Sequence, residues 1–465
     1  MTIRAHGLLL VVGLAALLFS ACGPSTSAAS PTVTLLPVST VTATLAPTRT
    51  PTPSATVDMS ALRGTSIRVW HAFVGQAAAV LADQMDRFNS ENEWGVIVSQ
   101  AGYGDQVTLY EAVNAALAAG SPPEMVAALP ERTLEWDASA KVVVLNPYIN
   151  HPDWGLPDGP ASGFVPIFWA QDTVEGRQLG VPAQRSARFL FYNQTWAHEL
   201  GFTHPPTSAD EFRQQACAAN ASFLSDRSPQ NDGYGGWIVD SDWQATYAWL
   251  LAFGGGVLAG DTYGFRTDPN LAALQFLKSL FDDHCAWIST EPTPYDAFAG
   301  RFALFASGDL AELPIATESL SRKQNTDEWT VLAFPGSTGS ALVAYGPSYS
   351  LLKSTPEKQL AAWLFIRWLV SPKNQSRWVE STGLFPLLRD GMEQISPPRA
   401  ASPQWEAAVG DLSVLQGVPQ LASWRTVRYV LEDGTKIIFQ NNLSLEEIPA
   451  LLTEMDSIAK DLSEK

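Results

Sequence analysis

Basic residues are scarce in this sequence. Lysine and arginine together number 29, against 47 aspartates and glutamates, which leaves a formal net charge of -18. Proteins that bind phosphate backbones or anionic membrane surfaces depend on clusters of basic side chains. We therefore expect neither nucleic acid nor an anionic membrane surface to be the main partner. The charge says little about small ligands.

Catalytic motifs are also missing. The sequence has no Gly-x-Ser-x-Gly elbow and no P-loop, and GGGVLAG at 254–260 is not a complete Gly-x-Gly-x-x-Gly. In HELGFTH, Phe202 stands where a zinc protease would have its second histidine. We expect a protein that is not an enzyme and that uses no cofactor or metal. A secreted glycoside hydrolase, which needs two facing carboxylates, is an alternative.

No apolar run is long enough to cross a membrane comfortably. The most apolar stretch of the main body, AAWLFIRWLV at 361–370, contains Arg367. The run Gly7–Phe19 follows Arg4 and has the length of a signal-peptide core. The chain is therefore predicted to be exported, with residues 1–21 as the signal peptide.

Cysteine occurs three times, and the first cysteine follows the apolar run directly. Cys22 comes after Ser20 and Ala21, in a pattern that resembles a bacterial lipobox whose cysteine is lipidated and becomes the new N-terminus. An ordinary cleaved signal with an incidental cysteine is the alternative. Residues 22–62 are rich in Ser, Thr, Pro and Ala, which predicts a disordered tether.

The other two cysteines, Cys217 and Cys285, form an even pair in a chain predicted to be exported. Exported proteins fold in oxidising compartments, where disulfides persist. We predict a Cys217–Cys285 disulfide, with two buried free thiols as the alternative.

Tryptophan is abundant, with 16 residues in a chain of which only 16% is charged. An indole offers a flat face and one N–H donor, which suits stacking against sugar rings. Core packing is the competing explanation for most of these side chains.

The main body begins with alternating strand and helix patterns. SIRVW, GVIVS and EMVAAL have strand patterns, and apolar residues recur with helical spacing between the first two. Such alternation predicts an α/β fold with parallel strands and crossover helices. Ligands bind beyond the carboxyl ends of such strands, which here means WHAFVG at 70–75, SQAGYGD at 99–105 and LPER at 129–132.

Three longer segments together resemble a known family. They are GRQLGVPAQRSARFLFYNQTWAHELGFTHPPTSADEF, FAGRFALFASGDLAELP, and the stretch that begins VAYGPSYSLLKSTPEKQ and ends STGLFPLL. Their order resembles that of the extracellular solute-binding proteins of ABC importers, in the branch that includes maltose-binding and glycerol-3-phosphate-binding proteins. The likeness extends over nearly the whole body.

The resemblance implies a two-lobed periplasmic-binding-protein-like fold of class II, with a ligand cleft between the lobes. It implies lobe one at 63–172 with 304–346, and lobe two at 173–303 with 347–465. Lobe closure would bring groups from both lobes onto one solute, and an ABC permease would recognise the closed form. A monomer is expected.

In lobe one, the resemblance implies that the strand tips hold the ligand contacts. These are His71 after the first strand, and Glu131 with Arg132 after the third. His71 could instead cap a neighbouring backbone group, and the other two could be a solvated helix start.

In lobe two, Ser186 in PAQRSAR matches a family position that hydrogen-bonds ligand hydroxyls, although most turn serines only stabilise the turn. Trp237 and Trp243 lie near glycines in the region of the sugar-stacking tryptophans of the family, and core packing is an equal alternative for each.

Three further contacts are implied near the carboxyl-terminal part. Gly346 stands where the family has a glycine whose backbone lies close to the ligand, with Tyr345 beside it. Arg425 falls near a contact position, and Arg428, one helical turn away, could take its place.

One residue bears on the choice of solute. Leu384 in STGLFP stands where glycerol-phosphate binders tend to have tyrosine, and a phosphate also needs converging cations or helix N-termini. A neutral sugar or oligosaccharide is therefore the predicted solute. A surface lipoprotein that senses a ligand or docks a partner, without import, is a further alternative.

Overall fold

The computed structural model describes residues 57–156, 163–389 and 402–464. The predicted signal peptide, Cys22 and most of the predicted tether lie outside these residues. Within the described ranges, every helix is too short or too polar to span a bilayer.

The folded body begins earlier than predicted. Met59–Leu62 forms a short 3-10 helix (η1), which is capped by Asp58 through a hydrogen bond from the Ser60 backbone N–H. Leu62 is completely buried in the core. The expectation of a disordered tether up to residue 62 is therefore wrong for these last residues, because the apolar side chains there have a core to pack against.

The first sheet has the strand order β2-β1-β3-β16-β6. As predicted, β1 is parallel to β2 and β3, whereas β16 is antiparallel to both β3 and β6. The strand bounds are β1 Ser66–His71, β2 Ile97–Gly102, β3 Met125–Ala128, β6 Val181–Pro182 and β16 Ser348–Leu351. This sheet and its helices are called lobe one below.

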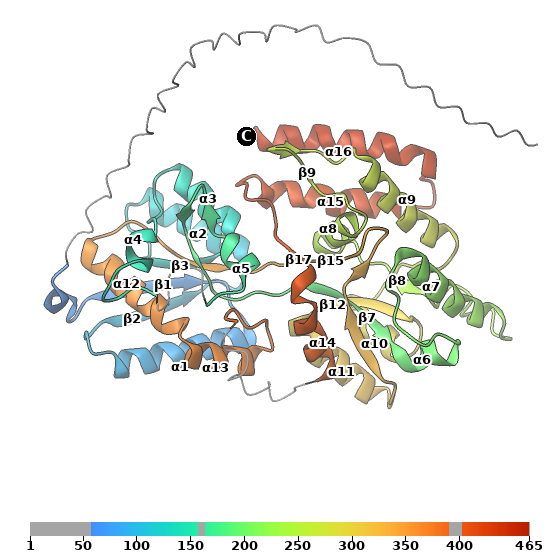
Figure 1. The fold of residues 1–465 in the computed structure, drawn as a ribbon, viewed down its shortest axis with the longest axis horizontal. Helices are drawn as coiled ribbons and strands as arrows, with labels where there is room; N and C mark the ends of the chain where they lie inside the picture. The colour runs from blue at the N-terminus through green and yellow to red at the C-terminus, as the bar shows by residue number, and fades with distance from the viewer. Residues whose placement is uncertain (1–56, 157–162, 390–401, 465) are drawn as a thin grey trace, which may run out of the picture. The chain divides into compact units, whose positions relative to one another are not determined.

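Crossover helices and later helices complete lobe one (Figure 1). Helix α1 packs against α13, and α12 lies against β1 and β16. The helix bounds are α1 Gly75–Glu91, α2 Gln106–Ala118, α3 Pro130–Ala138, α4 Asn146–Ile149, α5 Pro166–Ala170, α12 Pro356–Leu369 and α13 Pro372–Thr382. The hairpin of β4 (Thr173–Val174) and β5 (Arg177–Gln178) follows α5.

The second sheet has the order β11-β8-β12-β7-β13. Its central strand β12 is antiparallel to β7 and parallel to β8. The strand bounds are β7 Arg188–Asn193, β8 Trp237–Ile238, β11 Ala286–Trp287, β12 Phe305–Asp309 and β13 Trp329–Leu332. This sheet and the elements packed on it are called lobe two below.

Lobe two holds most of the remaining elements. Helix α8 packs on a small sheet of order β14-β15-β17, and α15 packs on α8 and α16. The helix bounds are α6 Gln194–Glu199, α7 Ala209–Leu224, α8 Trp243–Ala252, α9 Asp268–Asp282, α10 Tyr295–Ala299, α11 Leu313–Arg322, α14 Pro403–Gly410, α15 Trp424–Ile438 and α16 Ile448–Ser463. The short helices are η2 Leu310–Glu312, η3 Asp411–Val414 and η4 Leu445–Glu447, and the further strands are β9 Leu258–Ala259, β10 Thr262–Tyr263, β14 Phe334–Pro335, β15 Ser340–Val343 and β17 Leu415–Gln416.

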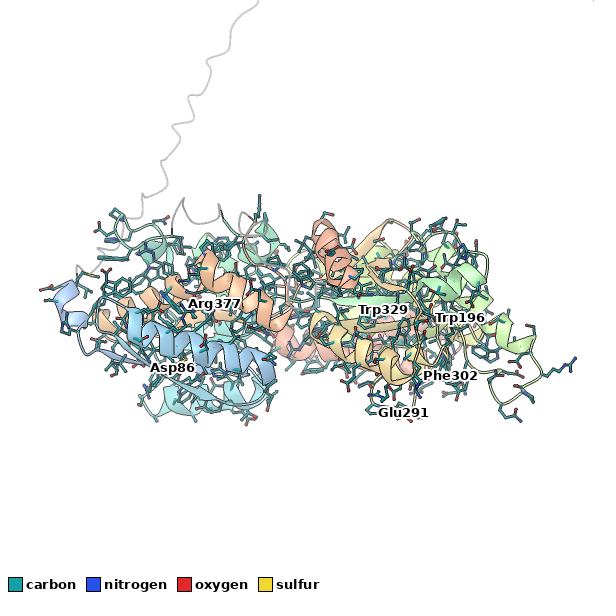
Figure 2. All side chains as sticks on the ribbon, turned by 90° about the horizontal axis from the view of Figure 1, so that it is seen from below. Asp86, Trp196, Glu291, Phe302, Trp329 and Arg377 are labelled. Carbon is teal, nitrogen blue, oxygen red and sulfur yellow. A yellow bond between two sulfur atoms is a disulfide. The ribbon has the colours of Figure 1, made fainter. Side chains whose placement is uncertain are left out.

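Labelled side chains show the division into two lobes (Figure 2). Asp86 of α1 and Arg377 of α13 lie on neighbouring helices of lobe one, and Trp196 of α6 and Trp329 of β13 lie in lobe two. The mixed α/β architecture expected from the sequence is confirmed.

Two of the segments that connect the lobes run side by side, and a third passage, between α13 and α14, lies partly outside the described residues. Residues 183–187 join β6 to β7, and residues 344–347 join β15 to β16. The backbone N–H of Ser186 donates to the Tyr345 carbonyl oxygen (2.9 Å), and the N–H of Tyr345 donates to the Ser186 carbonyl oxygen (3.0 Å). These two stretches are called the crossing segments below.

The strand pairing corrects the expected lobe boundaries. Residues 304–346 were expected in lobe one, but β12 and β13 both pair with β7 in lobe two. Residues 347–389 were expected in lobe two, but β16 pairs with β3. The first crossing follows Pro182, later than the expected boundary at 172/173. The buried apolar strands of both lobes read alike in sequence, so the pattern did not identify the partner of each strand.

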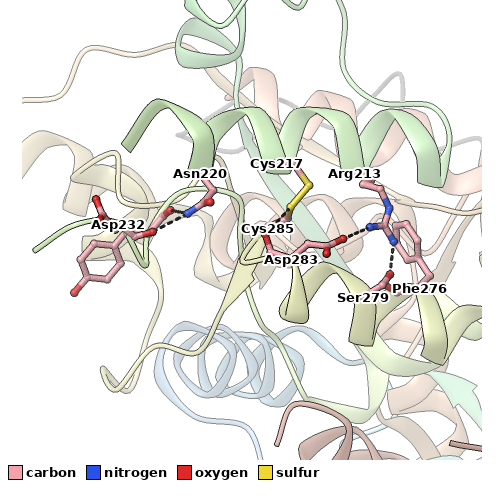
Figure 3. The surroundings of a disulfide bond; sticks show 9 residues. Arg213, Cys217, Asn220, Asp232, Phe276, Ser279, Asp283 and Cys285 are labelled. Carbon is pink, nitrogen blue, oxygen red and sulfur yellow. Dashed lines mark hydrogen bonds and ion pairs between the residues drawn. A yellow bond between two sulfur atoms is a disulfide. The ribbon is translucent and has the colours of Figure 1, made fainter. Parts of the chain in front are cut away.

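The predicted disulfide is confirmed. Cys217 of α7 is bonded to Cys285, which precedes β11, across a sequence separation of 68 residues (Figure 3). One helical turn earlier on α7, Arg213 forms an ion pair with Asp283, at 2.8 Å between Nη1 and Oδ2. The disulfide therefore fixes α7 to the loop between α9 and β11 inside lobe two.

Candidate functional site

A cavity of about 780 Å³ is bounded by both lobes and by both crossing segments. Lobe one contributes residues at the starts of α1, α2 and α3, beyond the carboxyl ends of the parallel strands β1, β2 and β3. Ligands of open α/β sheets bind at this edge, and cavities of this size suit small-molecule ligands. We call it the interlobe cavity. It is the candidate solute site.

Glu131 lies on the cavity wall, in the first turn of α3. Its side chain is only 3% exposed, and Oε1 accepts a hydrogen bond from Nη1 of Arg428 at 2.8 Å. Arg428 belongs to α15 of lobe two, so this buried ion pair joins the two lobes. Arg132, the next residue, does not line the cavity, and its guanidinium lies 4.0 Å from the ring centroid of Tyr110.

Of the two arginines considered on α15, Arg428 lines the cavity and Arg425 does not. The Nε atom of Arg425 lies 3.0 Å from Oε2 of Glu135, and its guanidinium lies over Tyr110. The two arginines have different surroundings because α3 packs against α15 so that Arg425 meets Glu135 and Arg428 meets Glu131. The preference for Arg425 over Arg428 is thus corrected by the position of the helix.

His71 does not line the cavity, contrary to expectation. Its Nδ1 accepts a hydrogen bond from the Phe73 backbone N–H (3.1 Å), which leaves Nε2 to donate to Oε1 of Gln100 (2.8 Å). Burial lowers the pKa of His71, and the Gln100 hydrogen bond opposes that shift. The ring is therefore neutral at neutral pH, and the backbone-capping alternative describes it.

The two predicted tryptophans lie in different surroundings. Trp243 at the start of α8 lines the cavity, whereas Trp237 belongs to β8 of the second sheet and is completely buried. Trp237 packs edge to face on Trp249, and its Nε1 donates to Oγ of Ser307 at 3.4 Å. The core alternative thus applies to Trp237, because β8 runs between two buried strands of the sheet.

Ser186 and Tyr345 lie on the cavity wall, one on each crossing segment. The Tyr345 hydroxyl donates to Oδ2 of Asp309 at 2.6 Å, which ties the second crossing segment to the end of β12. Burial raises the pKa of Tyr345 well above its ordinary value, and the Asp309 carboxylate adds to the shift. The phenol therefore remains a hydrogen-bond donor at neutral pH.

Gly346 also lines the cavity, and it is required for close packing of the backbone. Its φ is +146°, and a Cβ at this position would meet the Gln184 carbonyl oxygen at 2.3 Å. The residue that approaches this glycine most closely is therefore on the other crossing segment.

Among the described residues, the cavity wall carries a single cationic side chain, Arg428, and Glu131 neutralises it. The wall also carries Asp105 and Asp309. Asp105 caps α2 by accepting from two backbone N–H groups, and Asp309 caps η2. The wall therefore offers no free positive charge within the part of the chain that the structure describes.

The sequence analysis missed several lining residues. Gln171, Gln184 and Gln244 place amide groups on the wall, and Trp424 lies edge to face against Trp243, with the ring centroids 5.5 Å apart. No motif marks Gln171 or Gln244, whereas Gln184 stands in PAQRSAR, two residues before Ser186. Two features of the sequence could have indicated lining residues. Gln171 lies next to the expected lobe boundary at 172/173, and Trp424 lies one helical turn before Arg428.

Metal ligation has no support in the described ranges, where no three His, Cys, Asp or Glu side chains come together in a suitable cluster. The composition of the wall suits reversible binding, because amides, hydroxyls and indoles all line a cavity of solute size.

Comparison with known proteins finds a matching family model and similar sequences and structures. The family model of the bacterial extracellular solute-binding protein matches residues 83–409. A binding protein of Brucella abortus (strain 2308) is 22% identical over 231 residues, which cover 49% of this chain and 55% of that protein. The chain thus spans about half the length of this curated relative.

Two other matches extend further. The sn-glycerol-3-phosphate-binding periplasmic protein UgpB of Yersinia pestis bv. Antiqua (strain Antiqua) is 24% identical over 368 residues, with 71% of this chain and 76% of that protein covered. The structure of the sugar-binding protein MalE from Xanthomonas citri matches with a TM-score of 0.73 at 21% identity, over 86% of this chain and 98% of that chain. The fold is therefore the two-lobed fold of such proteins, and the chain belongs to the bacterial extracellular solute-binding protein family.

Proposed function

We propose that this protein binds a neutral, hydroxyl-rich solute, a sugar or oligosaccharide, outside the cell and delivers it to an ABC importer. The observation that carries the proposal is the charge of the interlobe cavity. Its single described cation, Arg428, is already paired with Glu131 at 2.8 Å. A phosphate would gain most from a free cation, and of the three helix N-termini on the wall, α2 is already capped by Asp105 and α3 carries the Glu131 carboxylate in its first turn. Sugar hydroxyls can use amides and hydroxyls.

The apolar parts of the wall support the same solute class. Trp243 and Trp424 offer indole faces or edges to the cavity, and Leu384 adds an aliphatic side chain. Sugar rings have apolar faces that stack on indoles, and their hydroxyls need a polar rim. The UgpB relative binds sn-glycerol 3-phosphate by its name, and the paired arginine here argues for a different, uncharged solute.

A thermal-shift titration tests this function. We expect maltose, maltotriose or raffinose to raise the melting temperature, because a ligand at about 100 times its Kd adds about 2.7 kcal/mol to the folded state. We expect no rise with sn-glycerol 3-phosphate. A rise with the phosphate alone would contradict a neutral solute, and sugar turnover in the same samples would favour a hydrolase.

The same titration should separate the two predicted tryptophans. Trp243→Ala is expected to weaken binding of the active sugar by about 1 to 3 kcal/mol, because a stacked indole is lost from the wall. Trp237→Phe is the matched control, since that ring is buried away from the cavity. It should lower the melting temperature and leave Kd unchanged. Equal effects of both variants on Kd would show that Trp243 does not contact the sugar.

We further propose that the body is anchored to the membrane by a lipid on Cys22, which lies outside the described residues. The support is the sequence pattern around Cys22 alone. Cys22→Ala should move the protein from the membrane fraction to the soluble fraction, because the residue that carries the lipid is lost. Solute affinity should not change. Continued sedimentation of the variant with membranes would count against the anchor.

A further inference from the structure

On the cavity wall, the side-chain amide of Gln171 is hydrogen-bonded through its nitrogen but not through its oxygen. It directly follows α5, is 4% exposed, and its Nε2 donates to the carbonyl oxygen of Ala344 at 3.2 Å. This bond fixes the amide, because an amide oxygen in the place of Nε2 could not donate to a carbonyl. The Oε1 atom is buried and accepts no hydrogen bond from any described residue.

Gln184 presents a second acceptor of the same kind. Its side chain lines the interlobe cavity from the first crossing segment, and its Oε1 is also buried without a partner among the described residues. Its main-chain carbonyl is already engaged by Nη1 of Arg185 at 2.9 Å. Gln106, at the start of α2, adds a third buried Oε1 on this wall without a described partner. Buried polar groups in folded proteins are nearly always hydrogen-bonded, so these unpaired acceptors on one cavity wall indicate a ligand that donates.

An unpaired donor lies on the same wall. Trp424 is 1% exposed, and its Nε1 has no acceptor within the described part of the chain. Nε of Arg428 is a second donor on the wall without a described acceptor. A hydroxyl can both donate and accept, so a polyhydroxylated solute can satisfy the unpaired donors and acceptors alike. A carboxylate or phosphate oxygen accepts only, and it would face the amide oxygens without a proton to share.

We propose that Gln171 and Gln184 bind solute hydroxyls through their amide oxygens and thereby select a polyhydroxylated solute over an anionic one. This inference rests on the proposed function and adds two specificity-determining residues to it. Gln184 belongs to the first crossing segment, and Gln171 contacts the second. Gln171 holds the backbone at Ala344, and the next residue, Asp172, pairs with Arg185. A solute hydroxyl on Gln171 thus contacts a side chain that is fixed to the segment between the lobes.

The test is isothermal titration calorimetry with whichever of maltose, maltotriose or raffinose stabilises the wild-type protein. Gln171→Met and Gln184→Met keep the side-chain length and remove the whole amide, which at Gln171 also removes the hydrogen bond to Ala344. Each is expected to raise Kd about 5- to 10-fold, because one hydrogen bond in a buried site is lost. Gln184 is only half-buried, so its variant serves as the test if Gln171→Met folds poorly.

Gln178→Met is the matched control. Gln178 is a buried glutamine of lobe one whose Oε1 accepts from Thr173 Oγ1 and whose Nε2 donates to the Gly180 carbonyl oxygen, and it does not line the cavity. Its variant should lower the melting temperature and leave Kd unchanged.

The outcomes separate this inference from the function. Sugar binding by the wild type with unchanged Kd in both test variants would overturn the inference and leave the function standing. If the wild type binds none of the three sugars, the proposed function and the inference fail together. A rise in Kd confined to the two test variants supports both.

Discussion

Arg185→Met is expected to lower the free energy of unfolding by about 3 to 5 kcal/mol, the usual cost of removing one partner of a buried ion pair. The Arg185 side chain is completely buried, and its Nη2 lies 3.0 Å from Oδ2 of Asp172. The same guanidinium donates to Oγ of Ser348 and to the carbonyl oxygens of Gln184, Gly346 and Pro347. Both crossing segments are therefore tied to one side chain, and urea unfolding measures its loss.

The loss should depend on pH, because the carboxylate left behind is buried. Burial already raises the pKa of Asp172, and the charge of Arg185 opposes that shift. Without the guanidinium, the folded variant retains a proton on Asp172 that the unfolded chain releases as the pH rises. The stability of the variant should therefore fall with increasing pH, and its deficit should be larger at pH 8 than at pH 5.

Arg322→Met is the control for Arg185. Arg322 also forms ion pairs, with Asp296 and Glu318, but its side chain is 54% exposed. Exposed pairs contribute about 0 to 1 kcal/mol, so this variant should unfold almost as the wild type does, at both pH values. A loss below about 1 kcal/mol for Arg185→Met, without pH dependence, would show that the buried cluster contributes little.

Loss of the Cys217–Cys285 disulfide is expected to destabilise the protein by about 4 kcal/mol. The bond closes a loop with a sequence separation of 68 residues, and the chain-entropy model assigns about this value to a loop of such length. The double variant Cys217→Ala, Cys285→Ala should therefore unfold at a lower denaturant concentration than the oxidised wild type.

Reduction provides an internal control for the disulfide. Dithiothreitol should lower the stability of the wild type toward that of the double variant, and it should not change the double variant. Solute affinity should stay the same in both, because the bond lies within lobe two and neither cysteine lines the interlobe cavity. Equal stability of oxidised and reduced wild type would argue against a stabilising role.

Local sequence patterns were sufficient for the first half of lobe one. The alternation in Ser66–His71, the helical spacing in Gly75–Glu91 and the apolar run at Met125–Ala128 are confirmed as β1, α1 and β3. Each of these signals depends on neighbours within a few residues of the chain. Leu62 shows the limit of the approach, because a polar, proline-rich context concealed an apolar side chain that packs in the core.

Strand partners were not predictable in the same way. Phe305–Asp309 and Ser348–Leu351 are both short and mostly buried, yet they belong to different lobes. A fully buried strand lacks the alternation that would distinguish its two faces, and its partner is determined by contacts far away in the chain.

The residues of the candidate site also divide into those that the sequence identified and those that only the structure could place. The family resemblance directed attention to Glu131, Ser186, Trp243, Tyr345 and Gly346, which all lie on the cavity wall. Their contact with a solute stays a prediction. His71 and Trp237 were expected beside them. Instead, His71 accepts a hydrogen bond from a backbone N–H, and Trp237 is buried in the second sheet.

The sequence by itself predicted an α/β solute-binding protein with one disulfide, because local periodicity, an even pair of cysteines and the order of family segments indicate these properties. Only the tertiary structure decided which strands share a sheet, which arginine of α15 faces the cavity, and which glutamines carry unpaired oxygens. The physical reason is that these features depend on how distant segments pack. A polar side chain is a ligand contact or a structural group according to whether the folded protein has already satisfied its hydrogen bonds.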